Sequence, residues 1–210
     1  MTSPVKKILM AVAAFFILVL LALLPALAVY IDLQILQNNV GEVSMTEISQ
    51  ESMLLISSLI FFYGAARHPD KRGFLLLAGG FFLSMFIREW DYLFDKIQHG
   101  FWVYPASLIA LSCILAARFA CRGTTLQPLT GFINSRPYIF ILIGLTALLV
   151  LSRTFGSGNL LWSKILPPEF SGSLKTAIQE GLELYGYGLI LFGSSLLGFS
   201  RYTIDTETNK

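Results

Sequence analysis

The sequence predicts an all-α polytopic membrane protein with six transmembrane helices, both termini in the cytoplasm and a single membrane-embedded domain over residues 1–210. Three observations lead to this prediction. Of the 210 residues, 55% are hydrophobic and only 13% are charged, whereas an ordinary soluble domain has about 25% charged residues. Apolar stretches of roughly 20 residues, the length that crosses a bilayer, recur along the chain. Basic residues gather in alternate connections between these stretches.

Each predicted element is an apolar segment bounded by polar or Gly/Pro-bearing connections. The predicted spans are 8–30, 47–66, 73–95, 101–121, 137–155 and 174–200. In the first, the pair Lys6-Lys7, the long apolar run and Ala26-Leu27-Ala28 also resemble a secretory signal peptide that would be cleaved near residue 28. Because the apolar run exceeds the roughly 7 to 15 residues usual in such peptides, we expect a retained span.

Aromatic residues, one long loop and a pattern of small residues support the predicted boundaries and packing of the later spans. Aromatic residues lie near the predicted outer ends of the spans, as in an interfacial belt; they are Trp90, Trp102, Tyr104 and Trp162. The stretch 123–136 is the longest inner loop. In the sixth span, Gly181, Gly188 and Ser195 recur every seven residues, a spacing of small residues that favours close packing of helices.

The basic residues predict the orientation. Ten lie at the termini or in alternate connections: Lys6, Lys7, Arg67, Lys71, Arg72, Arg118, Arg122, Arg136, Arg201 and Lys210. The other five are Arg88, Lys96, Arg153, Lys164 and Lys175. Because short loops rich in Lys and Arg stay in the cytoplasm, the ten-residue side is the inner side. We therefore expect a multi-pass protein of the cell inner (plasma) membrane.

Composition also excludes some functions. The 15 Lys and Arg against 13 Asp and Glu leave a net charge of +2, and no basic run is present that could bind nucleic-acid phosphates. The two cysteines, Cys113 and Cys121, have no disulfide or zinc-site spacing, so we expect both to be packing residues. The expected partners are membrane lipids and another membrane protein, not nucleic acid.

Acidic residues show the opposite distribution to the basic ones. Ten lie on the outer side or in the outer half of a span: Asp32, Glu42, Glu47, Glu51, Glu89, Asp91, Asp95, Glu169, Glu180 and Glu183. Acidic residues contribute little to the orientation of a membrane protein, so their accumulation on the outer side needs a different cause. This accumulation is the first indication of a functional site.

Helix geometry places several of these charges in one layer. At 1.5 Å per residue, Glu51, Arg88, Arg153 and Glu183 lie roughly 24 to 27 Å from the inner surface. The spacing i, i+4, i+7, i+11 aligns one polar stripe on the third span, Ser84, Arg88, Asp91 and Asp95, and one on the sixth, Thr176, Glu180, Glu183 and Tyr187. Glu89 is turned about 100° from Arg88 and is expected to serve a different neighbour. The predicted ligand- or ion-binding residues are Glu51, Arg88, Glu89, Asp91, Asp95, Arg153, Glu180, Glu183 and Tyr187.

Carboxylates outnumber arginines in this layer. Surplus buried carboxylates must be protonated, hydrated or bound to a cation, so a divalent cation is a candidate cofactor. The candidate metal ligands are Glu51, Asp91, Glu180, Glu183 and His99.

Three classes of function remain open. The favoured one is binding or transport of a cation, a proton or a polar lipid headgroup at an outward-facing Arg/carboxylate site. The second is a metal-assisted enzyme acting on a lipid or phosphate at the outer leaflet, although the sequence has no nucleophile or metalloenzyme signature. In the third, the protein is a structural or accessory subunit of a membrane complex, and the charge layer is a staple between helices.

Overall fold

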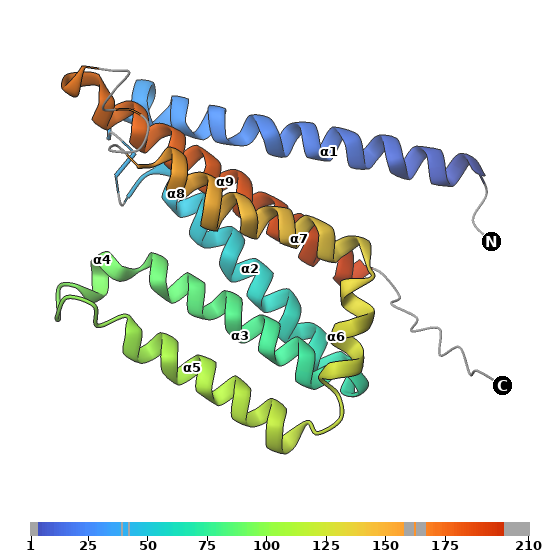
Figure 1. Ribbon diagram of the computed structural model, residues 1–210. Helices are drawn as coiled ribbons and strands as arrows, with labels where there is room; N and C mark the ends of the chain where they lie inside the picture. The colour runs from blue at the N-terminus through green and yellow to red at the C-terminus, as the bar shows by residue number, and fades with distance from the viewer. Residues whose placement is uncertain (1–3, 39, 42, 158–161, 163–166, 200–210) are drawn as a thin grey trace. The chain divides into compact units, whose positions relative to one another are not determined.

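The computed structural model describes residues 4–38, 40–41, 43–157, 162 and 167–199. This part of the chain consists of helices and the turns between them and contains no strand (Figure 1). The all-α prediction is confirmed. The α-helices are α1 Pro4–Tyr30, α2 Met45–Arg67, α3 Arg72–Glu89, α4 Asp91–Phe94, α5 Val103–Leu115, α6 Leu126–Ile133, α7 Arg136–Thr146, α8 Ser152–Phe155 and α9 Pro168–Phe199. Wider π turns extend three of them, at Ile31–Leu36, Ala116–Ala120 and Ala147–Leu151, and a 3-10 turn lies at Pro69–Lys71.

Each predicted span falls on one of these helices or on a run of joined helices. Four of the runs are long and apolar enough to cross a membrane: Pro4–Leu36, Met45–Arg67, Val103–Ala120 and Arg136–Phe155. α3 and α9, which correspond to the third and sixth predicted spans, are not among the four. The count of six spans stays a prediction.

The third predicted span is shorter than expected. It was predicted to reach residue 95, but α3 ends at Glu89. Trp90 leaves the helical conformation, with φ −88° and ψ 20°, and its N–H bonds to the carbonyl of Ile87. This tightened last turn ends the helix. Asp91 and Asp95 therefore do not continue the face of α3 that carries Arg88, which corrects the predicted stripe.

The contacts divide the chain into two compact units. The first unit contains Met1–Gln50 and Thr146–Gly188, and the second contains Glu51–Leu145 and Leu189–Lys210. α2 and α9 each contribute to both units. The prediction of a single domain stays a prediction.

In the first unit, a buried carboxylate organises the start of α2. Asp32 lies in the π turn that follows α1 and is completely buried. It accepts hydrogen bonds from the N–H groups of Met45 (2.7 Å) and Thr46 (2.9 Å) and from the Thr46 hydroxyl (2.6 Å). These contacts satisfy N–H groups that the first turn of a helix leaves without a helical partner. The direction in which α2 leaves the loop is thereby fixed.

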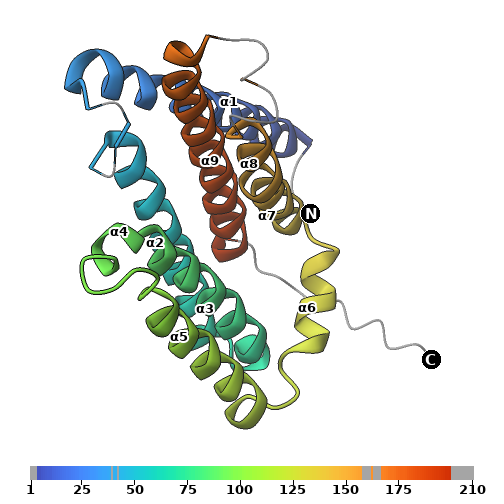
Figure 2. The ribbon, with the colours of Figure 1, turned by 60° about the vertical axis from the view of Figure 1, so that its left-hand side comes forward.

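In the second unit, small residues let α3 approach its neighbours closely. α3 and α5 lie side by side in both ribbon views (Figures 1 and 2). A Cβ at Gly80 would lie 2.6 Å from Sγ of Cys113, so no larger residue fits at this crossing. Ser58 on α2 donates to the carbonyl of Gly79 at 2.9 Å. Cys113 is thus a packing residue, as expected.

Candidate functional site

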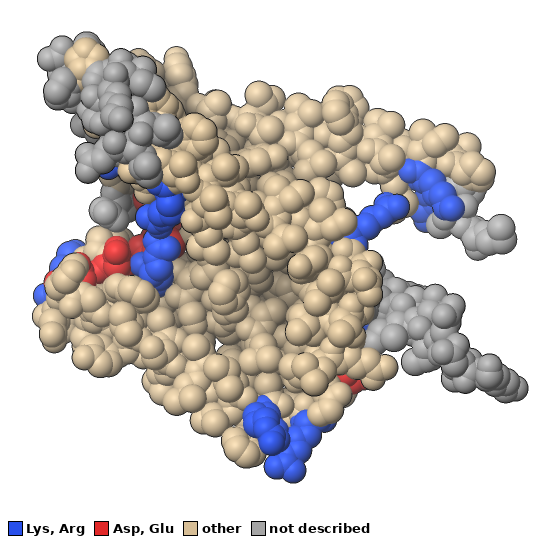
Figure 3. Space-filling view, in the orientation of Figure 1, with Lys and Arg blue, Asp and Glu red and all other residues tan. Residues whose placement is uncertain are grey.

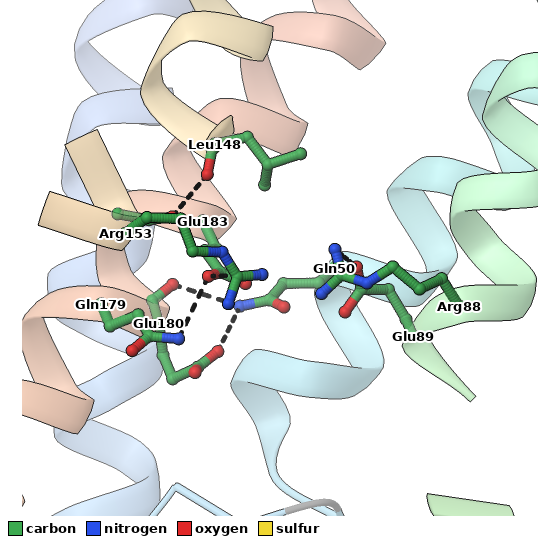
Figure 4. Close-up of polar contacts among 9 residues, drawn as sticks. Gln50, Arg88, Glu89, Leu148, Arg153, Gln179, Glu180 and Glu183 are labelled. Carbon is green, nitrogen blue, oxygen red and sulfur yellow. Dashed lines mark hydrogen bonds and ion pairs between the residues drawn. The ribbon is translucent and has the colours of Figure 1, made fainter. Parts of the chain in front are cut away.

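A group of polar side chains from three helices meets inside the first unit (Figure 4). We call it the Gln50 cluster and define it as Gln50 from α2, Arg153 from α8, and Gln179, Glu180 and Glu183 from α9. Gln50 is completely buried and Glu183 is 3% exposed. Burial of these two polar side chains is unfavourable unless their hydrogen bonds are made within the cluster or to a bound group.

Gln50 makes the contacts that join α2 to α9. Its Nε2 donates to the backbone carbonyl of Glu180 and to Oε2 of the same residue, both at 3.1 Å. Its Oε1 is buried and accepts no hydrogen bond, and among the described residues no other buried side-chain polar atom lacks a partner. A buried acceptor left without a donor costs about 1 to 3 kcal/mol. This oxygen is therefore the point at which a bound donor or cation would stabilise the protein.

Arg153 and Glu183 form the ion pair of the cluster. The distance from Nη2 of Arg153 to Oε1 of Glu183 is 3.7 Å, and the two side chains are 49% and 4% exposed. Gln179, one helical turn before Glu183, donates to the same oxygen at 3.3 Å. Glu183 is thus held at one oxygen by two neighbours, and the guanidinium reaches it from the exposed side.

Two local features place Arg153 and Gln179. The π turn Ala147–Leu151 precedes Arg153 and holds one more residue than an α turn, which shifts the side chains that follow it. Ser152 is buried and bonds back to the carbonyl of Leu148 (Figure 4). The Gln179 amide lies against Gly156, where a Cβ would collide with its Oε1. A glycine at residue 156 therefore leaves room for this amide.

No protein-family model matches the sequence, and neither a curated protein nor a solved structure shows significant similarity to it. Function is therefore inferred from the chemistry of the residues themselves. The Gln50 cluster contains three of the residues predicted from the sequence, Arg153, Glu180 and Glu183. A fourth, Tyr187, is buried one turn further along α9 in the same unit.

The remaining predicted residues belong to the second unit. Nη1 of Arg88 lies 3.6 Å from Oε1 of Glu89, whose side chain is 9% exposed. Two long adjacent side chains at a helix end thus meet despite their 100° separation. The expectation that Glu89 serves a different neighbour stays a prediction. Glu51 is half-buried on α2, and Asp91 is exposed on α4. The common depth of Glu51, Arg88 and Glu183 in the sequence also predicts that Arg88 is neutralised by one of these two carboxylates, and this pairing stays a prediction.

Asp95 and His99 belong to a turn beyond α4. The Asp95 carboxylate accepts a hydrogen bond from the N–H of Gly100 and contacts Nδ1 of His99, both at 2.8 Å. These two hydrogen bonds, the Gly100 one first, lower the pKa of the Asp95 carboxyl. Gly100 has φ +78°, a left-handed conformation that favours glycine. The pair closes an exposed turn.

The predicted metal set has no counterpart in the described part of the chain. No three His, Cys, Asp or Glu side chains there are grouped so that they could hold a metal ion. His99 contacts Asp95 in its own turn, and the carboxylate of Glu183 is held by Arg153 and Gln179. A metal bound by Glu51, Asp91, Glu180, Glu183 and His99 together is therefore not supported.

Sequence reasoning missed Gln50, Gln179 and Asp32 as organising residues. The site was predicted from charged side chains in apolar segments, and this criterion does not select glutamine, which is uncharged. Gln50 does directly precede Glu51, and it lies one turn after Glu47 on the predicted second span. A buried amide in an apolar helix is itself a signal, because it must find hydrogen-bond partners away from water.

Proposed function

We propose that this chain is a six-span protein of the inner (plasma) membrane with both termini in the cytoplasm. The ten-to-five split of basic residues supports this orientation. The helices found at all six predicted positions support the number of spans, and four of them have the length and composition of membrane-crossing helices.

We further propose that the Gln50 cluster binds a small cation or a proton-donating polar ligand, in transport or in ligand binding. The observation that carries this proposal is Oε1 of Gln50, a completely buried acceptor without a partner. A neutral carbonyl oxygen beside carboxylates is a suitable ligand for a cation or for an N–H or O–H donor. Occupation of this site would remove the cost of the unpaired acceptor.

The cluster lies close to the start of α2 and to the end of the helical run that finishes with α8. Gln50 is the sixth residue of α2, which begins at Met45, and Arg153 is on the short helix that ends at Phe155. In the proposed topology these are the outer ends of the second and fifth spans. A ligand would therefore enter from outside, past the half-exposed Arg153.

Ligand-dependent thermal stability of the purified full chain in detergent tests this proposal. The probes are NaCl, KCl, MgCl2, CaCl2 and ethanolamine hydrochloride, compared at constant ionic strength. A ligand at about 100 times its Kd stabilises a protein by about 2.7 kcal/mol. For a chain of this size that corresponds to an increase in Tm of roughly 5 to 10 °C.

The decisive variant removes the unpaired acceptor. Gln50→Leu should abolish the increase in Tm caused by the active probe, whereas Gln98→Leu, which changes an exposed glutamine beyond α4, should keep it. Glu180→Gln with Glu183→Gln should also lose the response. An equal increase in wild type and Gln50→Leu would overturn the proposal.

A structural role is the second candidate, and the same contacts favour it. The Gln50–Glu180 bonds and the Arg153–Glu183 pair connect α2, α8 and α9, so the cluster also has the form of a staple in an accessory subunit. In that case no probe changes Tm, while Gln50→Leu still lowers the stability of the unliganded protein.

A further inference from the structure

Two adjoining pockets lie in the second unit, which does not contain the Gln50 cluster. The first, of about 530 Å³, is lined by residues of α3, α5, the π turn Ala116–Ala120, the following turn and the start of α6. The second, of about 300 Å³, lies among α2, α3, α6 and α7. Leu77 and Thr125 line both pockets, so the two spaces adjoin at these residues.

The first pocket is basic. Arg118 and Arg122 line it, and neither forms an ion pair with any carboxylate in the described residues. Figure 3 shows Lys and Arg side chains gathered at this end of α5 on a surface that is otherwise mostly uncharged. Two guanidinium groups at one mouth are a receptor for an oxyanion, since each can donate two parallel hydrogen bonds to phosphate oxygens.

Backbone geometry adds to this basic character. Gly123 has φ +79°, which lets the chain reverse between the π turn and α6. Leu126, the first residue of α6, lines the same pocket. The N-terminus of that helix, which carries its positive end, therefore lies beside the pocket that the two arginines line.

The second pocket is almost entirely apolar. Its walls include the aromatic residues Phe61, Phe74, Phe81, Phe82, Phe132 and Tyr138. Phe61 and Phe82 pack with ring centroids 5.5 Å apart, and Phe74 and Phe132 with centroids 5.0 Å apart. Such a space offers hydrocarbon contacts and almost no hydrogen-bond partners, so it suits an alkyl chain better than water.

We propose that the two pockets form one binding site for an anionic phospholipid, with the phosphate on Arg118 and Arg122 and one acyl chain in the aromatic pocket. The two arginines of the first pocket complement the charge of the phosphate, and the apolar second pocket complements the acyl chain. A purely polar ligand would match only the first pocket. Basic pockets between helices on the cytoplasmic side are sites of this kind. In the proposed topology these arginines are on that side.

α6 has the composition expected of the wall of such a site. Pro128 and Phe132 are buried against the unit, while Leu126 and Ile133 are 77% and 45% exposed. A short helix with apolar residues on both its inner and outer faces suits the boundary between lipid headgroups and acyl chains. It would lie beside the bound headgroup.

Lipid titration of the delipidated full chain, followed by native mass spectrometry and by Tm, tests the proposal. The probes are dioleoyl phosphatidylglycerol, dioleoyl phosphatidylcholine, glycerol 3-phosphate and inorganic phosphate. The anionic lipid should bind at least tenfold more tightly than the zwitterionic one, and the two water-soluble phosphates should not change Tm. Equal affinity for both lipids, or an equal shift with inorganic phosphate, would overturn the proposal.

The contributions of the arginine charges and of the contacts with the acyl chain are then tested separately. Arg118→Gln with Arg122→Gln should weaken binding of the anionic lipid about 30-fold, while the matched pair Arg67→Gln with Arg136→Gln, two exposed basic residues outside the pocket, should change it less than threefold. Ala78→Phe fills the apolar pocket and should weaken both lipids equally. If the Arg118/Arg122 variant still prefers the anionic lipid, the site is contradicted. None of these residues belongs to the Gln50 cluster, so that result is independent of the cation proposal.

Discussion

Oδ2 of Asp32 accepts hydrogen bonds from both the backbone N–H and the hydroxyl of Thr46, at 2.9 and 2.6 Å, across 14 residues of sequence. The helix α2 is thus capped by a residue from the preceding helical segment as well as by its own N-terminal neighbour Ser44, whose Oγ accepts a hydrogen bond from the N–H of Glu47 at 3.1 Å. Because Gln50 lies one turn further along α2, the orientation of this cap also determines where the amide of Gln50 is presented to α9.

Asp32→Ala should therefore destabilise the protein and disturb the Gln50 cluster. Loss of a helix cap costs about 0.5 to 2 kcal/mol, and hydrogen bonds to a charged acceptor are stronger than neutral ones. We expect a loss of about 2 to 3 kcal/mol in the free energy of unfolding, measured by denaturant titration in detergent. Asp91→Ala, at an exposed position on α4, is the control and should change stability by less than about 0.5 kcal/mol; equal losses would contradict the role of the cap.

Arg153→Ala should be destabilising because it leaves Glu183 buried without its arginine. Breaking a fully buried pair costs about 3 to 5 kcal/mol, but Arg153 is half-exposed, so solvent reduces the expected loss to about 1 to 2 kcal/mol. A double-mutant cycle with Glu183→Gln measures this coupling. The double variant should recover part of the stability, and strict additivity would show that the two groups do not interact.

Gly80→Ala should weaken the packing of α3 on α5. The added methyl group would lie 2.6 Å from Sγ of Cys113, and overpacking of this kind costs about 1 to 3 kcal/mol. The second substitution Cys113→Ala should restore part of the loss. Gly172→Ala, on α9, has no atom within 4 Å of the new Cβ and should not lower the Tm.

The turn beyond α4 should respond to acid in a defined direction. Its two hydrogen bonds lower the pKa of the Asp95 carboxyl, so the stabilisation that they provide is complete above the unfolded pKa of about 3.9 and is lost as the pH falls through the lower folded value. A carboxyl titration by NMR with 13C-labelled aspartate should show Asp95 protonating below the model-peptide value of about 3.9. If Asp95 titrates at or above that value, the turn is not held by this carboxylate.

Labelling of single cysteines in a Cys113→Ala, Cys121→Ser background tests the topology. Gln34→Cys and Gln98→Cys should react with an impermeant maleimide in intact cells, because both lie on the proposed outer side. Asp70→Cys and Gln127→Cys should react only after permeabilisation. External labelling at residue 70 would contradict the proposed orientation.

The sequence by itself determined the all-helical class of the protein and the positions of its long helices. It did not predict the short helices α4 and α6, and α6 lies in the stretch 123–136 that was predicted to be a loop. Long apolar stretches can satisfy their backbone hydrogen bonds only within the same segment when water is absent, so the length and spacing of these stretches were enough to locate helices at all six predicted positions. The end of the third helix was not predictable in this way. It depends on the backbone conformation at Trp90, where hydrophobicity continues although the helix stops.

Tertiary structure alone decided which polar groups meet. Gln50 and Glu180 are 130 residues apart, and nothing local to either residue specifies the other as its partner. The charge count could indicate a polar layer, and it did identify Arg153, Glu180 and Glu183, because charged side chains in apolar helices must find compensating groups. Gln50 and Asp32 became visible only once distant segments were packed together, since what distinguishes them is burial and direction of hydrogen bonding, and both are properties of the folded arrangement.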